Sequence, residues 1–209
     1  MSGVNEIIVR EFFESIGFLV SQPYKHVAPG RRKRAEEELD LLVLNPAVSK
    51  ERIPDDMVWK AEDLQGINSA LVAVRGWHTE RFSSAIFEQT PELLRFADES
   101  TARIAARRLG TKDPVKILCL AELPASTDLK KKTLDLLRSK GIQGVLLFRT
   151  ILEQLISYVD RNRNYEKSDL LQVIRIIKSY GLFKDGQMEL FDRKQPRKRS
   201  RPSSRIEPA

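Results

Sequence analysis

Two short apolar runs, at residues 38–45 and 70–77, constrain the fold of this chain more than any other feature of its sequence. Both are rich in leucine and β-branched residues and end at Asn-Pro or Gly, as strands buried in a sheet do. Glu38 and Asp40 are two positions apart, so they project from one face of the first strand. Such a carboxylate pair in apolar surroundings costs free energy unless a metal, a base or a proton compensates it.

At these residues the sequence resembles the restriction-endonuclease-like, or PD-(D/E)xK, nuclease superfamily. ELDLLVLNP is similar to the strand that carries the family's Asp, and ALVAVRGWH is similar to its Glu-x-Lys strand. The resemblance implies a restriction-endonuclease-like α/β fold, with a mixed β-sheet flanked by helices, and a divalent metal such as Mg²⁺ that activates water against a phosphodiester. It places the catalytic roles on Asp40, Glu38 and Arg75, and the metal ligands on Asp40, Glu38 and Glu6.

The second strand departs from the family pattern at two positions. Ala73 stands in the place of the family's Glu, and an alanine cannot bind a metal. Arg75 stands in the place of the Lys; it can stabilise phosphate charge but stays protonated, so it cannot exchange a proton with water. His78 or Glu80 could replace the missing chemistry, or the Trp-His pair after the strand could simply pack at its rim. Glu6 has a similar alternative, as a favourable charge near a helix N-terminus.

The rest of the chain alternates helical and strand patterns, which favours an α/β sandwich with a mixed sheet. We expect residues 1–182 to form this domain and 183–209 to form a peptide and a disordered basic tail, and we expect 46–68 to be a partly ordered insertion. The predicted helices are 5–17, 84–110, 128–140, 151–159 and 168–180, and the predicted strands are 18–24, 38–45, 70–77, 115–120 and 144–148.

The net charge of +7 is concentrated near the C-terminus. Seven cations and one acid within 193–209 give +6, which leaves +1 for the other 192 residues. Basic clusters of this kind bind DNA phosphates. The candidate DNA-binding residues in a glycine-initiated loop are Arg31, Arg32, Lys33 and Arg34, and those in the tail are Arg197, Lys198 and Arg199. The alternative is that the acids at 36–38 neutralise the loop cations in solvent.

The segment Gln187-Met-Glu-Leu-Phe191 resembles the Gln-x-x-Leu-Phe peptide by which many bacterial polymerases and repair proteins bind the replication sliding clamp. That resemblance implies that Gln187 makes polar contacts in a small pocket of the clamp, and that Leu190 and Phe191 fill an apolar cleft of the clamp. Large apolar residues beside a basic tail lose free energy in water unless something covers them. The alternative is that the segment packs on the protein's own body as a final strand or turn.

The cysteine and histidine content and the lengths of the apolar runs indicate in which cellular compartment the protein functions. Cys119 is the single cysteine and lies in an apolar run, which indicates a buried thiol in a reducing cytoplasm. Two histidines argue against a histidine-built metal site. No apolar run reaches the roughly 18 residues of a membrane-spanning helix, and the N-terminus lacks the pattern of a signal peptide. We expect a cytoplasmic, nucleoid-associated protein whose partners are DNA, the clamp and, as a homodimer, a second copy, with no membrane.

The leading hypothesis is a catalytically impaired DNA-binding protein acting in DNA repair, replication or mobile-element biology. The first alternative is an active Mg²⁺-dependent endonuclease with rearranged acids, in which Asp40→Ala abolishes cleavage and leaves the fold intact. The second is an α/β interaction module that binds RNA or the ribosome through its tail. An Asp40 that faces the hydrophobic core with an arginine partner and no cleft would contradict the nuclease-like interpretation. Convergence of Glu38, Asp40 and Arg75 at a sheet edge beside a basic groove would support it.

Overall fold

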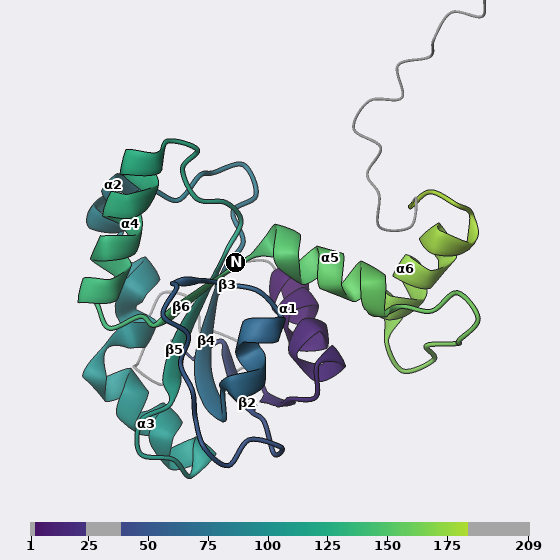
Figure 1. Ribbon diagram of the computed structural model, residues 1–209, viewed down its shortest axis with the longest axis horizontal. Helices are drawn as coiled ribbons and strands as arrows, with labels where there is room; N and C mark the ends of the chain where they lie inside the picture. Colours follow the sequence, from purple (N-terminus) through teal and green to yellow (C-terminus); the bar gives the residue numbers. More distant parts are fainter. Residues whose placement is uncertain (1–2, 24–38, 184–209) are drawn as a thin grey trace, which may run out of the picture.

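The structure is a computed structural model that describes residues 3–23 and 39–183. It is an α/β protein built on one mixed six-stranded sheet in the order β1-β2-β4-β5-β6-β3 (Figure 1). The strands are β1 (Leu19–Ser21), β2 (Leu41–Leu44), β3 (Val58–Trp59), β4 (Ser69–Arg75), β5 (Val115–Leu120) and β6 (Gly144–Leu147). β2 is antiparallel to both β1 and β4, whereas β4, β5, β6 and β3 pair in parallel.

Helices cover both faces of the sheet. The α-helices are α1 (Gly3–Ser15), α2 (Ser84–Gln89), α3 (Glu99–Leu109), α4 (Thr127–Ser139), α5 (Phe148–Tyr158) and α6 (Asp169–Ser179), with two 3-10 helices, η2 (Glu62–Gly66) and η3 (Pro91–Ala97). α1 and α5 lie on one side of the sheet and α2, α3 and α4 on the other, while α6 lies at the far end of α5 (Figure 1). None of the helices in the described ranges is long and apolar enough to span a membrane.

β4 shows why the central strands are apolar throughout. Its alternate residues enter two separate cores: Val72 and Val74 pack with α1 and α5, and Leu71 and Ala73 pack with α2, η3, α3 and α4. Successive strand residues point to opposite faces, so a sheet covered on both sides needs apolar residues at nearly every position. Cys119 of β5 is completely buried, as predicted, and burial raises the pKa of its thiol.

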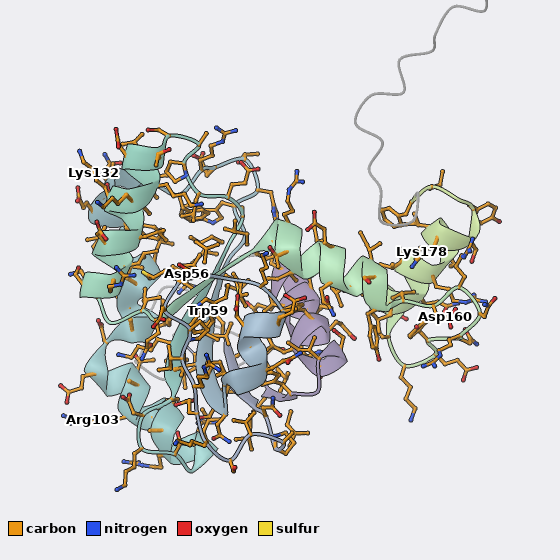
Figure 2. The ribbon with its side chains drawn as sticks, in the orientation of Figure 1. Asp56, Trp59, Arg103, Lys132, Asp160 and Lys178 are labelled. Atoms are coloured by element: carbon orange, nitrogen blue, oxygen red, sulfur yellow. The ribbon has the colours of Figure 1, made fainter. Side chains whose placement is uncertain are left out.

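Most predicted elements are confirmed within two residues at each end. The helix predicted at 84–110 is instead divided into α2, η3 and α3, and the insertion predicted at 46–68 is more ordered than expected. It supplies η2 and the edge strand β3, whose Trp59 is completely buried. The indole N–H of Trp59 donates to the Asp56 carbonyl at 2.6 Å, and both residues are labelled in Figure 2. A Cβ on Gly144 of β6 would lie 2.4 Å from this indole, so the glycine is required for β3 to pair beside β6.

Candidate functional site

Asp40 lies immediately before β2, which pairs with β4. Its side chain accepts a hydrogen bond from the β4 backbone, where a strand residue would use its own backbone carbonyl. Its Oδ2 accepts the backbone N–H of Val74 at 2.8 Å. The same oxygen accepts a hydrogen bond from Nη1 of Arg75 at 2.6 Å, which makes a short ion pair. The paired strands therefore hold Asp40 and Arg75 together even though they are 35 residues apart in the sequence.

Arg75 ends β4 with its side chain inside the protein, only 2% exposed. Besides the bond to Asp40, its guanidinium donates to the backbone carbonyls of Leu93 and Val74, both at 3.0 Å. Its Cζ lies 5.8 Å from the ring centroid of Phe96. A residue that stabilises phosphate charge has to reach the substrate, whereas this arginine is enclosed by η3 and neutralises Asp40.

Glu6 approaches the same place from α1. The side-chain amide of Gln22 donates a hydrogen bond to Oε2 of Glu6. The pKa of the Glu6 carboxyl is raised, first by burial and then by the negative charge of Asp40, while Gln22 and Arg75 oppose the rise. Glu6, Asp40 and Arg75 thus act on one another electrostatically although they come from α1, from the residue before β2 and from the end of β4.

Asn5 and Gly76 join α1 to the end of β4. The Asn5 amide donates to the Gly76 carbonyl at 3.0 Å, and the Asn5 Oδ1 lies 3.0 Å from Nε2 of His78. A Cβ on Gly76 would lie 2.1 Å from the Asn5 amide nitrogen, so only glycine allows this approach. The His78 ring also contacts Phe148 edge-on, with ring centroids 4.7 Å apart.

Asn5 and Gly76 were not among the site residues predicted from the sequence. A glycine directly after an apolar strand was the available indication, because such a glycine often marks a close approach of backbone. It could not indicate that the partner is Asn5, 71 residues earlier.

The remaining predicted residues divide into two groups. Ala73 is completely buried in the core under η3 and α3, and Glu80 is exposed in the turn after β4. The other predicted residues lie outside the described ranges, namely Glu38, Arg31, Arg32, Lys33, Arg34, Gln187, Leu190, Phe191, Arg197, Lys198 and Arg199.

A magnesium ion fits the described residues poorly. Magnesium is commonly held by one or two carboxylates together with phosphate oxygens and water. Glu6 and Asp40 are carboxylates of this kind, but Arg75 already balances the charge of Asp40 and occupies one of its oxygens. Among residues 3–23 and 39–183, no group of three or more His, Cys, Asp or Glu side chains could hold a metal ion. We therefore assign no chemical step to a metal.

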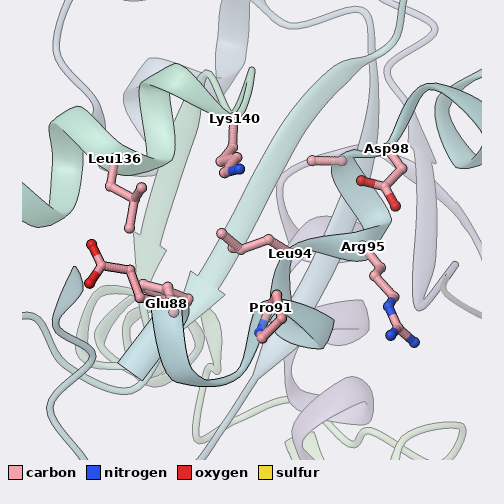
Figure 3. Close-up of a pocket in the computed structure, with 9 residues that line it drawn as sticks. Glu88, Pro91, Leu94, Arg95, Asp98, Leu136 and Lys140 are labelled. Carbon is pink, nitrogen blue, oxygen red and sulfur yellow. The ribbon is translucent and has the colours of Figure 1, made fainter. Parts of the chain in front are cut away.

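A groove elsewhere in the molecule is lined by other residues. It has a volume of about 470 Å³ and lies between α2, η3 and the end of α4 (Figure 3). Leu94 and Leu136 line its apolar part, and the charged side chains of Glu88, Arg95 and Lys140 surround it. Asp40, Glu6 and Arg75 are not among its lining residues, so this groove is separate from the carboxylate site.

The condition that would contradict the nuclease-like interpretation is met only in part. Asp40 has an arginine partner, yet its side chain keeps 11% of its exposure and has Glu6 as a second charged neighbour. Comparison of the chain with protein-family models, curated proteins and solved structures found no match.

Proposed function

We propose that this chain is a DNA-binding protein with a restriction-endonuclease-like fold whose nuclease chemistry is impaired. The observation that carries the proposal is the short ion pair between Asp40 and Arg75. In the nuclease family that the sequence resembles, the acid on this strand is a metal ligand. Here an internal cation balances the acid, so the carboxylate is less able to attract a metal ion.

The order of the elements supports the fold part of the proposal. The resemblance predicts a helix, then a strand with Asp, then a strand carrying the Glu-x-Lys positions. α1, β2 and β4 follow in this order, and β2 pairs directly with β4. The resemblance matches Glu6 to a Glu on the first helix, Asp40 to the strand Asp and Arg75 to the Lys position, and these three residues interact electrostatically at the end of this strand pair.

The DNA-binding part rests on charge. The cations at 31–34 immediately precede the strand region that carries Asp40, and those at 197–199 belong to the basic tail. Cations that neutralise DNA phosphates release bound counterions, so affinity falls steeply with salt. A role in repair, replication or mobile-element biology follows from the resemblance, and the Gln187–Phe191 peptide would tether the protein to a sliding clamp.

The test combines binding and cleavage with the full chain. Labelled duplex, single-stranded, flap and four-way-junction DNA are titrated over a salt series by fluorescence anisotropy, and the same DNAs are incubated with Mg²⁺ and with Mn²⁺. We expect salt-dependent binding without cleavage. Failure to bind any DNA at low salt would remove the proposal, and metal-dependent cleavage would replace it with the active-nuclease alternative.

A charge-matched pair of variants locates the DNA contacts. One variant replaces Arg31, Arg32, Lys33 and Arg34 by Gln, and the control replaces Lys130, Lys131, Lys132 and Arg138 of α4 by Gln. Both variants lose the same number of positive charges, so a general electrostatic effect would lower the DNA affinity of both variants alike. We expect the first variant alone to show a markedly shallower salt dependence, by about one unit for each phosphate that the protein no longer neutralises.

An active endonuclease remains the second candidate because Glu6 lies close enough to Asp40 for the two carboxylates to interact, and two carboxylates can hold a divalent metal. Its discriminating variant is Glu6→Gln, which keeps the hydrogen bond from Gln22 and removes the charge. Cleavage that is present in the wild type and lost in this variant would favour the second candidate.

A further inference from the structure

Trp77 ends a column of three stacked aromatic rings. Its centroid lies 5.8 Å from that of Phe82, with 26° between the ring planes, and Phe82 lies 5.7 Å from Phe87 at 27°. Phe82 is completely buried and Phe87 is 2% exposed, whereas Trp77 is 39% exposed. The indole therefore stacks on a buried ring while part of the Trp77 surface remains accessible to solvent.

The column is held in place by the surrounding backbone. Asn5 fixes Gly76, the residue before Trp77, through the bond to its carbonyl. The Glu80 N–H donates to the Trp77 carbonyl at 3.1 Å, and the Phe82 N–H donates to the Glu122 carbonyl at 2.9 Å. An indole held in this way loses little conformational entropy when a ligand covers it, so its binding surface is largely preorganised.

The chemistry of this surface favours a flat ligand. Aromatic rings gain free energy by offset stacking on a further planar π-system, and nucleobases stack on tryptophan without regard to sequence. Trp77 lies two residues after Arg75, so it is close in sequence to the carboxylate site formed by Glu6, Asp40 and Arg75. A base inside a duplex has both faces covered by its neighbours, so only an unpaired or extruded base can reach the indole.

We propose that Trp77 is a stacking platform for an unpaired base of DNA. This inference rests on the proposed function, and it adds the form of DNA that the protein prefers. It predicts tighter binding to single-stranded, flap or bulged DNA than to fully paired duplex of the same length.

The chain contains two tryptophans, and they provide a direct optical test. Trp59 is completely buried in the core and Trp77 is exposed, so an oligothymidine that stacks on the protein should quench Trp77 alone. We expect quenching on titration of the wild type, and no quenching in Trp77→Phe, whose remaining tryptophan is Trp59. Unchanged Trp77 emission at saturating oligothymidine would overturn the inference.

Affinity measurements give the second test. Loss of one base–indole stack reduces affinity by about 5- to 150-fold. We expect Trp77→Ala to lose this factor in affinity for bulged and single-stranded DNA and to keep its affinity for duplex DNA. We expect Trp77→Phe, which keeps an aromatic ring, to lose less. The matched control is Tyr180→Ala, which removes an aromatic side chain that is 80% exposed beyond α6. We expect this control to retain the preference for unpaired bases.

The outcomes separate this inference from the proposed function. If the wild type binds no DNA, both fail. If it binds duplex and unpaired DNA equally and Trp77→Ala changes neither affinity, only the stacking inference fails. Tighter binding of an oligouridine RNA of the same length would overturn the assignment to DNA. Circular dichroism of Trp77→Ala and of Trp77→Phe tests whether each variant is folded, so that a loss of affinity reports the missing indole.

Discussion

Asp40 has two charged neighbours that differ in almost every respect. Arg75 is buried, carries the opposite charge, and donates to the Asp40 carboxylate and to two backbone carbonyls. Glu6 is half-buried, carries the same charge when ionised, and has Gln22 as its hydrogen-bond donor. The contacts of Arg75 with Asp40 and the two carbonyls thus stabilise the folded protein. The glutamate side stores an unfavourable charge interaction, which is more typical of a binding or catalytic site.

The largest expected effect comes from removing the cation. Arg75→Met leaves the Asp40 carboxylate without its partner and two buried carbonyls without their donor. Breaking one member of a buried ion pair typically costs about 3–5 kcal/mol. We expect a loss of this size in the free energy of unfolding, measured by urea denaturation. Arg81→Met is the control, because the Arg81–Glu122 pair is mostly exposed and such pairs contribute about 1 kcal/mol or less.

A double-mutant cycle shows how much of that loss belongs to the ion pair. Asp40→Asn keeps an oxygen for the Val74 N–H but leaves Arg75 as an uncompensated buried charge. We expect Asp40→Asn combined with Arg75→Met to be more stable than the sum of the single losses predicts, because neither charge is then left alone. Additive losses would show that the ion pair itself contributes nothing. Asp40→Ala would also leave Arg75 without its carboxylate partner, so we expect that variant to lose stability as well.

The contact between α1 and β4 comes next in size. Gly76→Ala would push a methyl group into the Asn5 amide, and overpacking of this kind costs about 1–3 kcal/mol. Because Asn5 precedes Glu6, we also expect the displacement to weaken the coupling of Glu6 to Asp40. Gly3→Ala is the control, since a Cβ there has no atom within 4 Å. Equal stability of the two variants would contradict the proposed contact.

The sequence predicts features that depend on local physical chemistry. Gly17, Gly141 and Gly181 have the positive φ angles that suit the residue after a helix. The Ser168 hydroxyl accepts the Leu171 N–H, as an N-cap residue does. Buried strands were recognisable because both of their faces are apolar.

The site was harder to predict because it depends on contacts between distant segments. Asp40 and Arg75 meet only through the register of β2 on β4, and nothing near either residue indicates that this arginine turns inward. The same holds for β3, a strand of two residues that exists because Trp59 fills the space over Gly144. Local patterns therefore indicated Glu6, Asp40 and Arg75 as candidate residues, but they could not show that Asp40 and Arg75 form an ion pair.

The smallest expected effect on stability comes from Glu6, the second charged neighbour of Asp40, and it depends on pH. Folding raises the pKa of Glu6 above its ordinary value of 4.5, so the folded protein holds this proton more tightly than the unfolded chain does. The ionised carboxylate therefore lowers stability at neutral pH, and this cost disappears as the pH falls through the raised pKa towards 4.5.

Glu6→Gln should remove that cost while its amide oxygen still accepts from Gln22. We expect the variant to unfold at a slightly higher temperature than the wild type at pH 7–8, and the two to converge near pH 4. Glu14→Gln is the comparison, because burial also raises the pKa of Glu14, but there Arg10 opposes the rise more strongly than the neighbouring Glu11 adds to it. A Glu6→Gln variant that is less stable than the wild type at pH 8 would mean that the Glu6 carboxylate is a stabilising group, and that the two sides of Asp40 do not differ as the structure indicates.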